Sequence, residues 1–129
     1  MKNEAQAVKP YTLKLEDRPE YLYAFVESDS RDYERASQYW REIAERFAAT
    51  DHLNLLVEKG LSPKTTLTDA FELVSEFPRM FTNVRLAFVD PDSGNQEVNE
   101  FAETVATNRG IVGRVFQNFA EAEDWLLDR

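Results

Sequence analysis

The sequence has no cysteine, only four glycines and a single histidine among its 129 residues. The absence of cysteine excludes disulfides, thiolate nucleophiles, and zinc or iron–sulfur centres held by cysteine. The scarcity of glycine bears on nucleotide binding, because dinucleotide and phosphate loops need closely spaced glycines between a strand and a helix. None of the glycines opens such a turn: Gly60, Gly94, Gly110 and Gly113. The sequence therefore carries neither motif.

Basic residues are also in short supply. Lysine and arginine number 15 against 24 acidic residues, which gives a formal net charge of −9. Proteins that bind nucleic acid need a basic surface for the phosphates, so we expect no nucleic-acid partner. Hydrophobic residues still make up 43% of the chain, which favours a packed core over disorder. This length predicts one domain, residues 1–129.

Long hydrophobic runs are missing as well. No stretch approaches the roughly 18 apolar residues that a membrane-spanning helix requires, so we expect no membrane span. The first ten residues include Glu4 and lack the apolar run of a secretion signal. We interpret residues 1–9 as a flexible leader before the first strand and predict a cytoplasmic location.

Two strand patterns open the rest of the sequence. Residues 11–16 alternate apolar and polar side chains, and residues 21–26 are apolar on both faces. The short turn at Pro19 allows only an antiparallel hairpin, with the first strand at the sheet edge. Helix patterns follow at residues 33–47, 66–77, 98–106 and 118–126, with strand patterns between them at 53–58, 84–89 and 112–117. The order β-β-α-β-α-β-α-β-α predicts an α/β fold with an open, mostly parallel five-stranded sheet and an antiparallel edge strand.

Polar residues at the predicted strand ends raise the question of a phosphoacceptor site. Asp90 ends the fourth strand and Glu58 ends the third. A receiver-type site also needs a lysine from the last strand, but that strand ends in Gln117, and Lys59 belongs to the third. Polar residues are ordinary at the carboxyl ends of strands in this fold class, because the chain returns to water there. We therefore predict no receiver-type phosphorylation site.

The single imidazole and the acidic helix face have ordinary explanations too. His52 follows Asp51, and we interpret it as a polar residue at a helix–strand junction. Glu97, Glu100 and Glu103 share one helix face that lies away from the apolar stripe, which is typical of a solvated surface. We predict no metal ligands, no cofactor-binding residues and no cofactor.

A run of motifs in the second half of the chain resembles a group of small bacterial single-domain proteins. The motifs are Leu-Ala-Phe-Val-Asp at 86–90, Phe-Ala-Glu-Thr-Val-Ala at 101–106, Asn-Arg-Gly at 108–110, Arg-Val-Phe at 114–116, Glu-Ala at 121–122 and Trp-Leu at 125–126. The group is similar to the STAS superfamily, the sulfate-transporter and anti-sigma-factor-antagonist domains, and the predicted element order matches that superfamily from about residue 11 onward. The resemblance implies a β-α superhelical, non-catalytic domain that binds partner proteins, with some members binding nucleotides or lipids.

The resemblance also points to one loop. In the antagonist branch, a serine beside the start of the second helix is phosphorylated by a partner kinase, which breaks the complex. The corresponding loop here, residues 58–69, lacks the Asp-Ser-Ser-Gly pattern of that branch. It does offer the hydroxyls of Ser62, Thr65, Thr66 and Thr68, which form a candidate interaction or phosphorylation loop. Thr66 is most simply a helix cap.

The leading hypothesis is a non-catalytic regulatory module that binds a protein partner through this loop. The alternative is a small-molecule or lipid-binding module. If the helices cover mainly one sheet face, the other face carries an apolar patch that needs a ligand, a homodimer partner or a covering segment. The candidate residues of that patch are Tyr21, Tyr23 and Phe25. A covering helix is its ordinary explanation.

An enzyme is the third alternative, and we rank it last. It would have to rest on Asp90, Glu58, His52 or Arg109. Nothing in the sequence brings these residues together, so we predict no catalytic residue.

Overall fold

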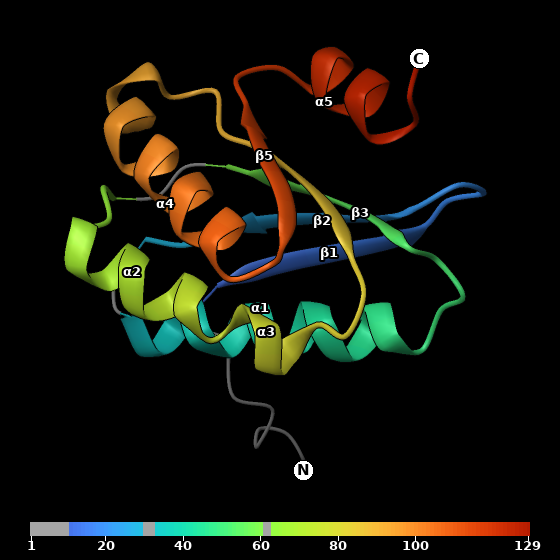
Figure 1. Ribbon diagram of the computed structural model, residues 1–129, viewed down its shortest axis with the longest axis horizontal. Coiled ribbons are helices and arrows are strands. Elements are labelled where there is room, and N and C mark those ends of the chain that lie inside the picture. Colours follow the sequence, from blue (N-terminus) through green and yellow to red (C-terminus); the bar gives the residue numbers. More distant parts are fainter. Residues whose placement is uncertain (1–10, 30–32, 61–62) are drawn as a thin grey trace, which may run out of the picture.

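The computed structural model describes residues 11–29, 33–60 and 63–129 (Figure 1). The leader predicted at residues 1–9 lies outside these ranges. None of the described helices has both the length and the apolar character that crossing a bilayer requires. In chain order the elements are β1 (Thr12–Asp17), β2 (Leu22–Glu27), α1 (Tyr33–Ala48), β3 (Asn54–Lys59), α2 (Leu67–Ser75), α3 (Phe77–Met80), β4 (Arg85–Val89), the short 3₁₀ helix η1 (Ser93–Asn95), α4 (Gln96–Asn108), β5 (Val112–Phe116) and α5 (Phe119–Leu126).

The strands form one five-stranded sheet in the order β1-β2-β3-β4-β5. β1 is antiparallel to β2, while β2, β3, β4 and β5 run parallel to one another. The predicted α/β fold with an antiparallel edge strand is therefore confirmed. Because the parallel strands share one direction, their carboxyl ends lie along the same edge of the sheet.

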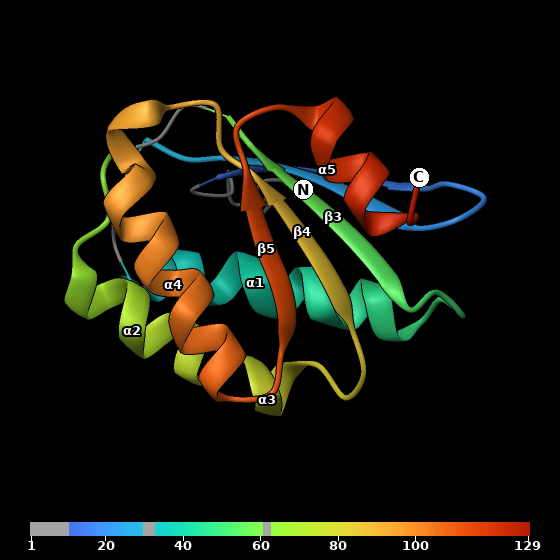
Figure 2. The ribbon, with the colours of Figure 1, turned by 45° about the horizontal axis from the view of Figure 1, so that its top comes forward.

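One face of the sheet is covered by α1, α2, α3 and α4 (Figure 1 and Figure 2). The register places Leu22, Leu55 and Leu86 side by side across β2, β3 and β4. All three are buried in the larger core on this face, together with Trp40 and Ile43 of α1. The apolar stripes that repeat every three or four residues along the helices pack against this surface.

The other face carries α5 (Figure 2). Here the register aligns Tyr23, Leu56 and Ala87, which alternate in sequence with the residues that face the larger core. Ala122 and Leu126 of α5 pack against them and form a second, smaller core. The central strands are buried on both faces, which explains their almost continuous apolar sequence.

The helix predicted over residues 66–77 is divided in two. α2 ends at Ser75, and the short α3 begins at Phe77, with Pro78 in its first turn. Proline has no N–H to donate, and the first turn of a helix is where no intrahelical donor is needed. The interruption expected at Pro78 is confirmed, although the break falls at Glu76, two residues earlier.

Candidate functional site

A cavity of about 130 Å³ lies between the sheet and helices α1, α2 and α4, and we call it the helix-side cavity. Exposed residues such as Pro63 and Arg114 take part in its lining, so it reaches the surface. An engineered protein cavity of about 150 Å³ admits benzene, so this space suits a single ring or a short alkyl chain. Its apolar walls include Tyr39, Trp40, Val74, Phe88 and Val98.

Small residues at facing positions keep this space open. Each of the three helices around it contributes alanine where its neighbours in the apolar stripe are large, and β5 contributes a glycine. The small lining residues are Ala36, Ala70, Ala102, Ala106 and Gly113. Because the surrounding side chains are anchored in the core, they do not collapse into the space that a larger residue would fill.

One end of the cavity is polar and lies where β3 and β4 finish. The register pairs Glu58 with Val89, which brings Lys59 beside Asp90. The Lys59 ammonium nitrogen lies 3.5 Å from Oδ2 of Asp90, and the Asp90 side chain is only 1% exposed. A buried carboxylate is stable only when it is paired and hydrogen-bonded.

Two asparagines complete the set of donors around Asp90. The side-chain nitrogens of Asn95 and Asn99 donate to Oδ2 of Asp90 at 3.0 and 2.9 Å. The backbone N–H of Asp92 donates to Oδ1 at 3.1 Å. We call Lys59, Asp90, Asn95 and Asn99 the strand-end cluster.

The strand-end cluster separates two hollows. Lys59 and Asn95 line the helix-side cavity, whereas Asp90 lines a second, polar hollow of about 280 Å³ next to it. Asn99 lines both. The helix-side cavity thus has apolar walls and polar side chains at one end, which is the arrangement that binds a molecule with an apolar body and a polar head.

Sequence reasoning missed this cluster. It assigned Lys59 to the third strand without a partner and gave no role to Asn95 or Asn99. The available signal was that consecutive parallel strands end side by side, so the last residue of β3 meets the residue just after β4. The i, i+4 spacing of the asparagines at the start of α4 places both amides on the face that meets Asp90.

The residues on which an enzyme would have to rest do not come together. His52 lies at the opposite edge of the sheet, where its Nε2 is 2.6 Å from Oδ1 of Asp17. The guanidinium of Arg109 lies over the Phe71 ring, 5.0 Å from its centroid. Glu58 points to the α5 face, away from Asp90. In the described part of the chain, no group of three or more histidine, aspartate or glutamate side chains is arranged to hold a metal ion.

The hydroxyls of the candidate interaction or phosphorylation loop fall in different environments. Thr66 is the N-cap of α2, and its Oγ1 accepts a hydrogen bond from the N–H of Asp69 at 3.1 Å. Thr65 is half-buried and lines the helix-side cavity, whereas Thr68 is exposed on the first turn of α2. Ser62 lies outside the described residues.

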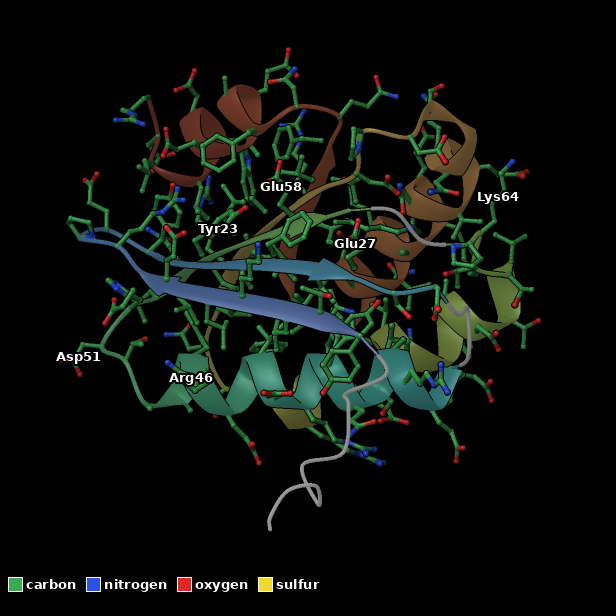
Figure 3. The ribbon with its side chains drawn as sticks, turned by 180° about the vertical axis from the view of Figure 1, so that it is seen from behind. Tyr23, Glu27, Arg46, Asp51, Glu58 and Lys64 are labelled. Carbon is green, nitrogen blue, oxygen red and sulfur yellow. The ribbon has the colours of Figure 1, made fainter. Side chains whose placement is uncertain are left out.

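The predicted apolar patch lies on the α5 face of the sheet. Figure 3 shows Tyr23 and Glu58 on this side, with Arg46 of α1 on the other side. Tyr21 is 3% exposed and Tyr23 is 9% exposed, while Phe25 is half-buried. Both tyrosines belong to the core that α5 completes. The structure thus places a helix against the patch, which is the ordinary explanation that we gave for it.

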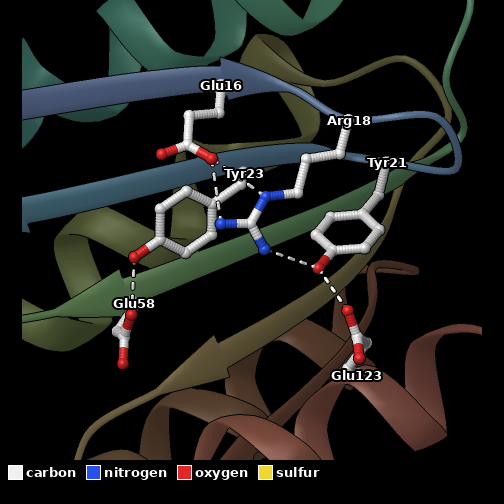
Figure 4. Close-up of polar contacts among 6 residues, drawn as sticks. All are labelled: Glu16, Arg18, Tyr21, Tyr23, Glu58 and Glu123. Carbon is white, nitrogen blue, oxygen red and sulfur yellow. Dashed lines mark hydrogen bonds and ion pairs between the residues drawn. The ribbon is translucent and has the colours of Figure 1, made fainter.

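Polar contacts hold the two tyrosine rings in place (Figure 4). The hydroxyl of Tyr21 donates to Glu123 and that of Tyr23 donates to Glu58, each at 2.5 Å. Burial, followed by these carboxylate contacts, raises the pKa of both phenols above its ordinary value. Both phenols therefore stay protonated and serve as donors near neutral pH.

Arg18 covers the outer side of the same rings. Its guanidinium lies 4.1 Å from the centroid of the Tyr23 ring and donates to the Tyr21 hydroxyl at 2.9 Å. Glu16 holds the other side of the guanidinium at 3.0 Å (Figure 4). This stacked arginine also lies over Phe119, the first residue of α5, and shields the apolar rings from water together with that helix.

Comparisons with protein families and with curated proteins identify no relative of this chain. No protein-family model matches the chain, and no match is found among the curated proteins. The resemblance to STAS domains stays a prediction from the residues.

Proposed function

We propose that this protein is a non-catalytic binding module that holds a small molecule with an apolar body in the helix-side cavity. The observation that carries the proposal is the cavity itself: about 130 Å³ of space with apolar walls and a polar end at the carboxyl edge of a parallel sheet. Ligands of open α/β sheets bind at this edge.

The size of the cavity sets the scale of the ligand and of its affinity. A six-membered ring with one short substituent fills a space of this order. With about eight non-hydrogen atoms and a ligand efficiency of about 0.5–1 kcal/mol per atom, the binding free energy is about 4–8 kcal/mol, which corresponds to a Kd between about 1 mM and 1 µM. Larger ligands would have to extend through the opening beside Pro63 and Arg114.

Binding is favoured over catalysis because the charged groups at the polar end are engaged with one another. Lys59 is paired with Asp90, whose oxygens also accept from Asn95 and Asn99. A carboxylate that already accepts several hydrogen bonds is a weak base and a weak nucleophile. The strand-end cluster therefore orients a ligand and stabilises the loops around the opening.

Trp40 offers a direct test, since it lines the cavity. We would titrate a Trp125→Phe variant with benzyl alcohol and follow the fluorescence of the remaining Trp40. Saturable binding is expected, and Ala102→Leu should abolish it by filling the space. Ala48→Leu, at an exposed position of α1, is the matched control and should bind as before. Absence of saturable binding in the parent, or retained binding in Ala102→Leu, would contradict the proposal.

A regulatory protein-binding role is the second candidate, and one observation favours it. Leu67 and Phe71 lie one turn apart on α2 and are 44% and 42% exposed. They extend the surface beside Thr68 and the loop before α2, where the STAS resemblance puts the partner. Such paired apolar side chains on a helix are typical anchors for a partner protein. We place either role in the cytoplasm of a bacterium, with which a chain that lacks cysteine is compatible.

Affinity capture tests this second role. A tagged protein should retain a specific partner from a bacterial lysate, and Leu67→Glu with Phe71→Glu should lose it. The control is Leu53→Glu, because Leu53 is the most exposed large apolar side chain among the described residues and lies before β3 at the opposite edge of the sheet. Equal capture by both variants would count against α2 as the partner surface.

A further inference from the structure

We infer that the helix-side cavity selects ligands that carry a protonated amine over ligands of the same size that carry a carboxylate. This inference rests on the proposed function, because it specifies which polar head the cavity accepts. It follows from the charged groups around the cavity and from the rings in its walls.

The titratable charges that line the cavity are unequal in number. Three are acidic and two are basic: Glu27, Asp69, Glu103, Lys59 and Arg114. The net contribution of the lining is therefore 2 − 3 = −1. The chain as a whole carries −9 and adds a field of the same sign.

Each of the two basic groups has one contact with a residue that does not line the cavity. The ammonium of Lys59 is paired with Asp90, which does not line the helix-side cavity. The guanidinium of Arg114 lies over the Phe116 ring, 5.4 Å from its centroid, and Phe116 does not line the cavity either. An incoming carboxylate would compete with Asp90 for Lys59, and it would be repelled by the three acidic groups of the lining.

Among the acidic residues, Glu103 keeps hydrogen-bonding capacity. Glu103 accepts one hydrogen bond, from the N–H of Val115 to Oε2 at 2.8 Å. A carboxylate offers about four acceptor sites, so Glu103 can also accept from a ligand. Because Glu103 stands on α4 and is half-buried, its charge is less screened than that of a fully exposed carboxylate.

The walls favour a cation as well. Tyr39, Trp40 and Phe88 bring aromatic rings to the cavity, and the faces of such rings attract ammonium groups. Burial raises the pKa of Tyr39 to about 12, so its hydroxyl stays neutral and adds no charge of its own. A protonated amine attached to a ring thus meets aromatic faces and unsatisfied carboxylate capacity in the same cavity.

Three probes with one ring and different heads test the inference. Benzylamine, benzyl alcohol and benzoate would be titrated at pH 7 and low ionic strength against the Trp125→Phe protein, with Trp40 fluorescence as the readout. We expect benzylamine to bind best and benzoate to bind at least about tenfold more weakly than benzylamine. Benzoate binding as tightly as benzylamine, or more tightly, overturns the inference and leaves the proposed function standing. No binding by any of the three probes overturns the proposed function itself.

A substitution that removes only the charge of Glu103 tests whether the selectivity for amines arises in the cavity. Glu103→Gln keeps a side-chain oxygen to accept from Val115 but removes the charge, so the gap between benzylamine and benzoate should narrow several-fold. Glu100→Gln is the matched control, because it removes the same charge from an exposed position of α4 that does not line the cavity. The inference is overturned if the ratio of the benzoate Kd to the benzylamine Kd stays unchanged in Glu103→Gln. It is also overturned if both variants lower that ratio equally.

Discussion

Lys59 and the buried Asp90 form an ion pair across the carboxyl ends of two neighbouring parallel strands, with 3.5 Å between Nζ and Oδ2. Lys59 is the last residue of β3 and Asp90 directly follows β4, so the pair marks the point where the sheet core ends. The amides of Asn95 and Asn99 share the same carboxylate and tie the start of α4 to this edge. Asp90 is therefore the centre on which the polar end of the cavity depends.

Replacing Asp90 should destabilise the protein strongly. Asp90→Ala leaves the partly buried Lys59 ammonium and two amides without their acceptor, and breaking such a pair costs about 3–5 kcal/mol. We expect a loss of this size in the free energy of unfolding, measured by urea denaturation. Asp51→Ala, which removes an exposed carboxylate, is the control and should change little. A loss below about 1 kcal/mol for Asp90→Ala would show that the pair carries little of the local stability.

The contribution of the α2 N-cap to the free energy of unfolding should be measurable by urea denaturation as well. Thr66→Ala removes the oxygen that accepts from the N–H of Asp69, and losing such a cap costs about 1 kcal/mol. Thr66→Ser keeps the oxygen and should restore most of that stability. Thr68→Ala, in the first turn of the helix and exposed, should stay within a few tenths of a kcal/mol of the parent. Similar losses for Thr66→Ala and Thr68→Ala would contradict the role of Thr66 as the cap.

Filling the cavity should stabilise the fold while it removes binding. Ala102→Leu adds apolar atoms to a space bounded by α1, α2 and the sheet, and cavity-filling substitutions commonly gain about 0.5–2 kcal/mol. The midpoint of urea unfolding should therefore rise. If Ala102→Leu instead lowers the midpoint, the space around Ala102 is already packed and the cavity is smaller than the geometry indicates.

Individual strands and helices show how much of the fold could be predicted from the sequence. The alternation at residues 11–16 and the doubly apolar run at 21–26 predicted β1 and β2, because burial on one or two faces dictates those patterns. The start of α2 followed from Thr66 and Asp69, whose spacing satisfies the first free N–H groups. The break at Glu76 was not placed correctly, since Pro78 fits equally well inside a first turn or just after a last one.

Most of the candidate site could not be predicted from the sequence. A periodic pattern shows which side of a helix is apolar, but not which face of the sheet that helix covers, so α5 was not assigned to Tyr21 and Tyr23. The pairing of Lys59 with Asp90 depends on which strands are neighbours and in what register. The cavity depends on the simultaneous approach of Ala36, Ala70 and Ala102 from three helices, and no local signal reports that meeting.

The tyrosines of the α5 face give a prediction for alkaline pH. Burial and the neighbouring Glu58 raise the pKa of Tyr23 above the ordinary value of about 10. The fold thus favours the neutral phenol, so this stabilisation is complete below about pH 10 and is lost as the pH rises toward the higher folded-state value. Unfolding free energies measured at about pH 8 and about pH 11 should fall less for Tyr23→Phe than for the parent.

The absorbance of ionised tyrosine measures this titration. It should show one fewer late-titrating phenol in Tyr23→Phe than in the parent. Glu58→Gln removes the neighbouring charge and should bring the pKa of Tyr23 back toward its ordinary value. If the parent and Tyr23→Phe lose the same amount of stability at alkaline pH, the loss does not come from Tyr23.

The sheet is also built in the order of synthesis, because neighbouring strands are consecutive along the chain from β1 to β5. Each strand that leaves the ribosome therefore meets a free edge provided by the strand made just before it. No later segment has to be inserted between strands that are already paired, which keeps the slow, long-range steps of assembly few. The nascent chain should acquire its hairpin first and its C-terminal helix last, and until that helix docks, the rings of Tyr21 and Tyr23 are the surface for a chaperone to shield.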